Sequence, residues 1–297
     1  GYTLARVRKP LVAVLLATSL AFSAYGTYGL SPYTQQWPRR VLLTHLLETG
    51  SWVPPPAAPA HSAEGEALEP PAHAAAPANV TSRLVLGICD SNPFSQLLTE
   101  VDPALLSQPR AVKGHELSSL YPVSKLVEVR TFDSPRPSAP LVAEPPYVRL
   151  TAAETHGAGA GSSVMLRLDM HVQRPCWGML NITTHRGAHL LSWSFADKLA
   201  PSPMGAAASA SASAYDGEQH MVRFSTQDPA PSWPFWLRVS APTASPSLSL
   251  SGLYGVRVEL HVAYLPETPE LARAVKGLPD WATPTWQTTT YFSHFDF

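Results

Sequence analysis

The sequence has few charged residues, few cysteines and almost no net charge. Only 14% of its 297 residues are Asp, Glu, Lys or Arg, against roughly 25% in an average soluble protein. This excludes a coiled coil or a charge-rich helical bundle, because both need abundant Glu and Lys. A net charge of −1 gives no electrostatic basis for binding nucleic acid. Proline is abundant, with 31 residues, but 45% hydrophobic content and eight Trp are enough for a packed core and argue against disorder throughout.

The sequence also lacks the short motifs that carry catalytic or metal chemistry. It has no HExxH, no CxxC and no GxSxG, so the common zinc and serine-nucleophile patterns are missing. His171 and His261 alternate with Arg, Asp and Glu, which favours solvated surface side chains over metal ligands. The HxD triplet of His294 and Asp296 has no acidic ligands downstream of it, so a strand is the expected structure there. We therefore predict no catalytic residue, no metal ligand and no cofactor in this chain.

One long uncharged run lies near the start, at residues 11–30. A helix of that length spans about 30 Å, the thickness of the hydrocarbon core of a bilayer. Three basic residues precede the run, so the positive-inside rule places residues 1–10 in the cytosol and the rest of the chain across the membrane. A cleaved signal peptide is the alternative, although its apolar region is usually only about 7–15 residues long. Either way, the body of the chain is expected in an exocytoplasmic compartment. A first residue that is not Met also predicts a fragment or a processed product.

Two further features fit a secretory compartment. Asn79 and Asn181 both begin acceptor sequons for N-glycosylation, which are used only in a secretory lumen. Cys89 and Cys176 are the only cysteines, and such a compartment would permit them to form a disulfide. In the chain-entropy model, a bridge closing so long a loop would stabilise the fold by roughly 4–5 kcal/mol. Two buried free thiols are the alternative.

Beyond residue 30, apolar and polar residues alternate with a period of two. The pattern is clearest at Ser163–Gln173 and Tyr254–Tyr264 and is typical of half-buried antiparallel strands. The sequence therefore predicts an all-β fold, an antiparallel β-sandwich of jelly-roll-like form with about ten strands. The other expected strands are Val41–Leu47, Arg83–Cys89, Ser124–Thr131, Tyr147–Ala152, Cys176–Thr184, His189–Ala196, His220–Ser225 and Phe235–Ala241.

The segments between the expected strands contain one helix and two tracts of low complexity. Pro269–Lys276 has the composition of a helix and is closed by Gly277. Residues 54–78 and 200–214 are rich in Pro, Ala and Ser and show no apolar period. Both tracts are expected to be insertions in surface loops, where added residues cost little stability.

The C-terminal residues carry the motifs of a known family. Leu278–Trp286 reads LPDWATPTW and is followed by Thr290, Tyr291 and a final Phe297. This resembles the closing segment of the endoplasmic reticulum metallopeptidases. Three further stretches are similar to lumenal strands of that family: Pro32–His45, Ser192–Ser194 and Pro234–Val239 with Leu253–Leu260. The structural residues that the resemblance marks are Trp236, Pro279, Asp280, Trp281, Trp286 and Tyr291.

The resemblance implies an architecture and a role. Members of the family are multi-spanning membrane proteins with a zinc exopeptidase domain, a membrane region and a C-terminal lumenal β-domain. This chain would then contain a cytosolic tail (1–10), the last membrane helix (11–30) and the lumenal domain (31–297). No position matches the zinc ligands or the general base of the family, so zinc is expected only in the peptidase domain. The chain is expected to be a non-catalytic, structural part of the endoplasmic reticulum membrane system, with the membrane and that peptidase domain or other lumenal proteins as partners.

A binding module is the alternative function. Exposed tryptophans on a β-sandwich can stack against sugar rings, so the chain could be a stand-alone secreted or cell-surface domain that binds a glycan or a protein. The candidate residues are Trp233, Trp236, Trp281 and Trp286.

Overall fold

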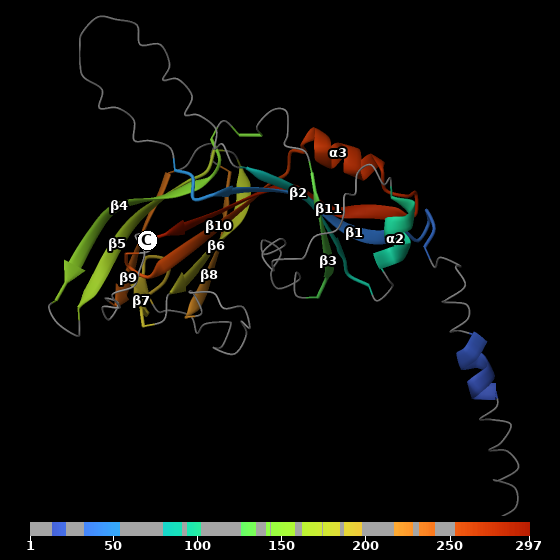
Figure 1. The fold of residues 1–297 in the computed structure, drawn as a ribbon, viewed down its shortest axis with the longest axis horizontal. Helices are drawn as coiled ribbons and strands as arrows, with labels where there is room; N and C mark the ends of the chain where they lie inside the picture. Colours follow the sequence, from blue (N-terminus) through green and yellow to red (C-terminus); the bar gives the residue numbers. More distant parts are fainter. Residues whose placement is uncertain are drawn as a thin grey trace, which may run out of the picture.

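Two β-sheets and a few short helices make up most of the described chain (Figure 1). The computed structural model describes residues 14–21, 33–53, 80–90, 94–101, 126–134, 141–142, 144–157, 162–173, 175–184, 187–197, 217–227, 232–240 and 253–297. The strands are β1 (Arg39–Gly50), β2 (Thr81–Ile88), β3 (Glu128–Asp133), β4 (Tyr147–His156), β5 (Ser163–His171), β6 (Cys176–Thr184), β7 (Leu190–Trp193), β8 (Gln219–Thr226), β9 (Ser232–Ser240), β10 (Val256–Tyr264) and β11 (Ala282–Asp296). The labelled helices are α2 (Phe94–Glu100) and α3 (Pro269–Lys276).

The larger sheet, sheet A, has seven strands in the order β3-β2-β1-β11-β10-β6-β8. Its neighbouring strands are antiparallel except for β1 and β11, which run parallel over most of their length (Figure 1). The expected β-sandwich is confirmed in its two sheets and its mostly β content, but the prediction that all strands are antiparallel is wrong at this pair. In this order β1 lies near the centre of the sheet, between β2 and β11.

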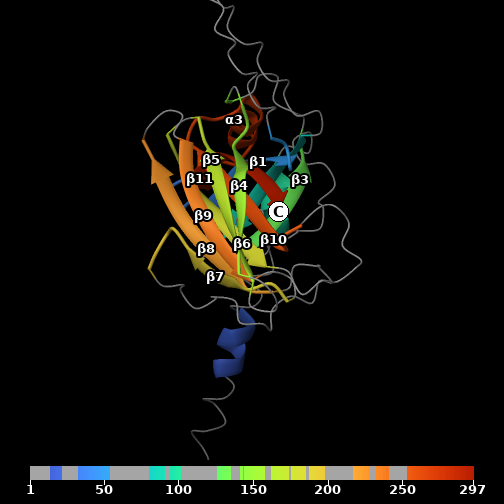
Figure 2. The same ribbon diagram turned by 90° about the vertical axis from the view of Figure 1, so that its left-hand side faces the viewer.

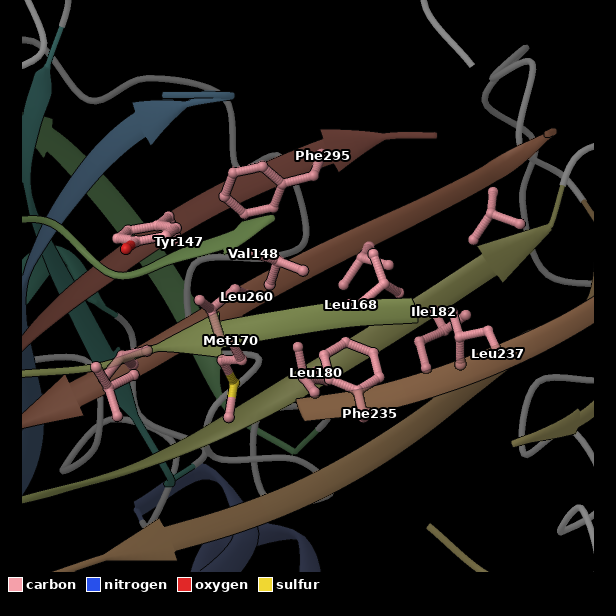
Figure 3. Close-up of a cluster of buried hydrophobic side chains, with 14 of the residues drawn as sticks. Tyr147, Val148, Leu168, Met170, Leu180, Ile182, Phe235, Leu237, Leu260 and Phe295 are labelled. Atoms are coloured by element: carbon pink, nitrogen blue, oxygen red, sulfur yellow. The ribbon is translucent and has the colours of Figure 1, made fainter. Parts of the chain in front are cut away.

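The smaller sheet, sheet B, packs on one half of sheet A. Its order is β4-β5-β9-β7, and Figure 2 shows these strands side by side. Alternate residues of both sheets point into the space between them and form the sandwich core. Figure 3 shows Leu168 and Met170 of β5 and Phe235 of β9 facing Leu180 of β6 and Leu260 of β10. The period of two in the sequence therefore produces this core directly.

A second core lies on the same face of sheet A, beneath α3 and Leu97 of α2. Leu271 and Ala274 of α3 and Leu97 of α2 pack against Val41 and Leu43 of β1 and their neighbours. Helix α3 begins as predicted: the Thr268 side chain accepts a hydrogen bond from the Leu271 amide, Pro269 follows, and Gly277 closes the last turn. Helix α2 was not expected from the sequence.

The predicted membrane helix is only partly described. Residues 14–21 form a helix whose Val14, Leu15, Leu16 and Leu20 side chains are exposed. Within the described residues, no helix reaches the length and apolar character that a membrane crossing requires. The rest of residues 11–30, the tail 1–10 and both Pro/Ala-rich tracts lie outside the described residues.

The structure contradicts the predicted disulfide. Both cysteines are unbonded: Cys89 is exposed just beyond β2, and Cys176 is buried at the start of β6. Strands β2 and β6 are separated by β1, β11 and β10, which corresponds to about 19 Å at the usual strand spacing. A disulfide needs Cα atoms within about 7 Å of each other. The order of the strands, which the sequence does not reveal, therefore prevents the bond.

This placement predicts unequal reactivity of the two thiols. Burial raises the pKa of Cys176 to about 12, whereas Cys89 is exposed, and the thiolate is the reactive form. Without any reductant, iodoacetamide should add one group to the native chain and two to the denatured chain, as counted by mass spectrometry. If the denatured chain takes up no label until it is reduced, a disulfide is present and this placement is wrong.

Candidate functional site

The C-terminal motif lies against the residues that lead into β1. The Tyr33 ring stacks on Trp281, with centroids 6.0 Å apart and planes inclined by 18°. The Arg39 backbone amide donates to the Trp281 carbonyl at 2.7 Å, and the Gln35 side chain donates to Asp280 Oδ2 at 3.2 Å. These contacts fasten residues 33–39 to the segment just before β11.

A buried charge pair completes this arrangement. The Arg39 guanidinium is 0% exposed and lies 5.3 Å from the centroid of the Tyr33 ring. Its Nε and Nη2 atoms donate to Asp90, at 2.9 and 2.8 Å. A fully buried guanidinium requires such a bidentate partner, because an unpaired charge there would cost several kcal/mol. We name Tyr33, Gln35, Arg39, Asp90, Asp280 and Trp281 the junction cluster.

The remaining motif residues also make structural contacts. Trp286 meets Trp177 edge to face, with centroids 5.0 Å apart, and its Nε1 donates to Thr288 Oγ1 at 3.1 Å. Tyr291 is buried in the sandwich core and packs edge to face on Tyr264. The Pro279 carbonyl accepts from the Ala282 amide as β11 begins. The motif residues near the C-terminus therefore hold β11 to its neighbours.

His45 lies at the seam between the two cores. On β1 it occupies the alternate position between Leu43 of the helix-covered core and Leu47 of the sandwich core. Its Nδ1 lies 2.6 Å from Thr268 Oγ1, the N-cap of α3, and its Nε2 lies 2.7 Å from Ser82 Oγ on β2. Burial lowers the pKa of His45 to about 4, so the ring is neutral at pH 7.

A cavity of about 340 Å³ opens on the outer face of sheet B. Ser232 Oγ donates to Asp169, and Arg167 Nε donates to Glu154 at 2.8 Å, a bond that lowers the pKa of the Glu154 carboxyl. The indole of Trp236 beside a guanidinium, a carboxylate and hydroxyls suits hydrogen bonding to a hydroxylated ligand stacked on the ring. The lining residues are Thr151, Arg167, Leu168, Asp169, Ser232, Pro234, Phe235 and Trp236.

Asn181 and His261 lie on the outer face of sheet A, and the predicted surface position of His261 is wrong. Asn181 is only 6% exposed, and its Nδ2, the atom that would carry a glycan, donates to Glu259 Oε2 at 2.8 Å. A glycan on this atom would compete with that hydrogen bond, and the glycosylation of Asn181 stays a prediction. His261, expected at the surface, is 1% exposed and lies 4.6 Å from the Phe292 ring. Asn79 lies outside the described residues, and its glycosylation stays a prediction.

His45 and the Arg39–Asp90 pair were not predicted from the sequence. The signal for His45 was available, because it shares the alternation of Leu43 and Leu47, which marks an inward position. Nothing local marks Arg39 or Asp90, which are 51 residues apart and meet only because β1 pairs with β2. Within the described ranges, no three His, Cys, Asp or Glu side chains are grouped so that they could hold a metal ion.

Comparison with known protein families supports the resemblance that the C-terminal motif indicated. Residues 110–294, more than half of the chain, match the family model of the C-terminal domain of endoplasmic reticulum metallopeptidase 1. The chain belongs to this family. The match includes Trp236, Asp280, Trp281 and β11 up to His294, whereas Tyr33, Gln35, Arg39 and Asp90 of the junction cluster lie outside the matched residues.

The solved structures that resemble this metallopeptidase C-terminal domain do so only weakly. No curated protein matches the chain. Among solved structures, the yeast delta-COP-I mu-homology domain complexed with a Dsl1 WxWxV peptide has 12% identity and a TM-score of 0.31, covering 86% of this chain and 96% of that one. The same yeast domain alone has 9% identity and a TM-score of 0.27, covering 86% and 95%. At TM-scores this low, the likeness carries no argument about function.

The buried His45 predicts a loss of stability in acid. Its pKa in the folded domain is about 4, below the ordinary value of 6.5, so its contribution is complete above pH 6.5 and is lost as pH falls towards 4. The loss should reach about 3 kcal/mol, because one pKa unit corresponds to about 1.4 kcal/mol. Denaturant titrations of the wild type and of His45→Gln should show a difference in free energy of unfolding that shrinks over this range.

The control is His171→Gln, which changes a half-buried histidine of β5. It separates the effect of His45 from the general effect of replacing a histidine on a strand. If the wild type and His45→Gln instead lose stability in parallel between pH 6.5 and 4, then His45 does not titrate as the structure indicates.

Proposed function

We propose that this chain is the non-catalytic, membrane-anchored lumenal domain of an endoplasmic reticulum metallopeptidase, with a structural role. The family match supports the lumenal β-domain, and the uncharged run at 11–30 supports a membrane anchor in the endoplasmic reticulum membrane. Zinc chemistry would belong to the peptidase domain of the family. The partners would be that peptidase domain or other lumenal proteins.

The position of β1 is the observation that supports this role most strongly. Arg39 follows Leu30, the end of the predicted span, by nine residues, which reach at most about 30 Å when extended. Instead of forming a free tether, the chain is then built into the middle of sheet A between β2 and β11. A domain attached to the membrane through a central strand would keep a fixed orientation close to the bilayer. A fixed orientation would allow a neighbouring domain to pack against it.

The junction cluster stabilises the attachment of the segment before β1 to the rest of the domain. The stacking of Tyr33 on Trp281 and the Arg39–Asp90 pair join the segment before β1 to the body of the domain. Tyr33 and Trp281 are 248 residues apart in the sequence, and Arg39 and Asp90 are 51 apart. A pull on the anchor would therefore be carried directly into β11 and the sandwich core.

Protease protection tests the proposed topology. The chain, with one epitope at each end, is made in sealed microsomes and treated with protease. We expect the C-terminal epitope to survive on a fragment a little shorter than the whole chain, and the N-terminal epitope to be lost. Adding detergent should expose both.

Digestion of the C-terminal epitope without detergent would contradict the lumenal placement. The non-catalytic part of the proposal has a separate test, because purified chain should release no amino acids from peptides when zinc is added. Zinc-dependent release would refute it.

Glycan binding is a second candidate function, favoured by the cavity on sheet B. Three of the four candidate tryptophans are engaged in packing: Trp233 meets Phe224, Trp281 meets Tyr33 and Trp286 meets Trp177. Trp236 alone of the four lines the cavity, beside Arg167 and Asp169. Trp236 is therefore the one of these four tryptophans that we propose as a glycan contact.

A glycan array with two matched variants tests this function. Trp236→Ala should abolish the binding of any glycan that the wild type retains. It should leave the thermal unfolding midpoint nearly unchanged, because the side chain lies on the outer face. Trp281→Ala removes the stacking in the junction cluster, so it should lower the midpoint and leave glycan affinity intact in the folded fraction. Equal binding by the wild type and Trp236→Ala would exclude the cavity as the glycan site.

A further inference from the structure

Trp37 is exposed in a way that the rest of the fold does not explain. All eight tryptophans are described, and seven are buried or half-buried, whereas Trp37 is 74% exposed. An exposed indole forgoes the burial that normally stabilises so large an apolar side chain. A ligand or surface that covers Trp37 would recover this free energy.

A tight turn holds Trp37 in this position. The Thr34 amide donates to the Trp37 carbonyl at 3.2 Å, and the Trp37 amide donates back to the Thr34 carbonyl at 3.0 Å. The same amide lies 3.2 Å from Thr34 Oγ1, and Gln35 within the turn bonds to Asp280. Pro38 follows and restricts the backbone further. The indole is therefore presented on a fixed turn, so little conformational entropy remains to be lost on binding.

The place of this turn in the chain indicates what covers it. Trp37 follows the end of the predicted span by seven residues, which reach at most about 25 Å. Tyr25 and Tyr28 fall near the same end of the predicted span in the sequence, and tyrosines and tryptophans are enriched where a span meets water. Arg40 is exposed next to the turn, whereas Arg39 is neutralised by Asp90. A cation beside an exposed indole suits the phosphate-bearing headgroup region of a bilayer.

We propose that the turn formed by Thr34, Gln35, Gln36 and Trp37 inserts the Trp37 indole into the headgroup region of the membrane. This rests on the membrane anchoring proposed above. The lipid contact would fix the tilt of sheet A on the membrane, because the same turn is bonded to Asp280 and leads directly into β1.

A fluorescent probe at this position tests the insertion. In a Cys89→Ser background, Trp37→Cys is labelled with a polarity-sensitive fluorophore, and the full chain is reconstituted in phosphatidylcholine vesicles. The probe should shift its emission to the blue, be quenched by nitroxide lipids labelled near the headgroup, and be shielded from aqueous iodide. Leu191→Cys on β7, 49% exposed and in sheet B, is the matched control and should stay water-like.

A second measurement uses the natural side chain. Brominated lipids should quench part of the intrinsic fluorescence of the unlabelled chain, and Trp37→Phe should remove that quenched part. This variant changes an exposed residue, so its thermal unfolding midpoint should match the wild type.

The possible outcomes separate the two proposals. If the chain floats with the vesicles but the probe at position 37 stays water-like, the insertion is refuted and the anchoring stands. If iodide is excluded while nitroxide lipids do not quench, a protein contact covers Trp37, and the lipid contact is likewise refuted. If the chain does not float at all, both the anchoring and the insertion fail.

Discussion

The parallel pairing of β1 with β11 connects the first and last strands of the domain. The two strands are in register from Arg39 with Ala282 to Gly50 with Ser293, with two irregularities along the way. Parallel neighbours need a long crossover connection, and here the whole chain from β2 to α3 provides it. The sheet therefore cannot be completed until both ends of the domain are present.

Polar groups on β1 reinforce this pairing. Arg39 is paired with Asp90, His45 bridges Ser82 and Thr268, and Thr44 Oγ1 lies 2.8 Å from Thr288 Oγ1 on β11. Arg39, Thr44 and His45 are buried, so a shift of β1 by one residue would leave them unsatisfied and turn its apolar side chains to the wrong face. The buried polar contacts thus select one register for the strand that would follow the membrane anchor.

The sequence predicted strands such as β5 and β9 well because they bury only one face. Val164, Leu166 and Leu168 alternate with polar residues and lie in the sandwich core as expected. Only the end of β11, around His294, was expected as a strand, and the rest was missed since Pro284 and the Trp motif hide its alternation. The predictions of a disulfide and of a surface position for His261 failed for a shared reason. Each depended on which strands are neighbours and on what covers the sheet, and these are tertiary properties that a local pattern does not contain. The junction cluster likewise joins residues from distant parts of the chain.

Hydrogen exchange of the native chain tests most directly whether β1 is an integral part of the core. If it is, the amides of residues 43–47 should exchange only through global unfolding, with the same free energy as those of β10 and the partner residues of β11. The account would be contradicted if β1 exchanged through a local opening of much lower free energy while β6 and β10 stayed protected, because the anchor segment would then be a detachable edge of the domain.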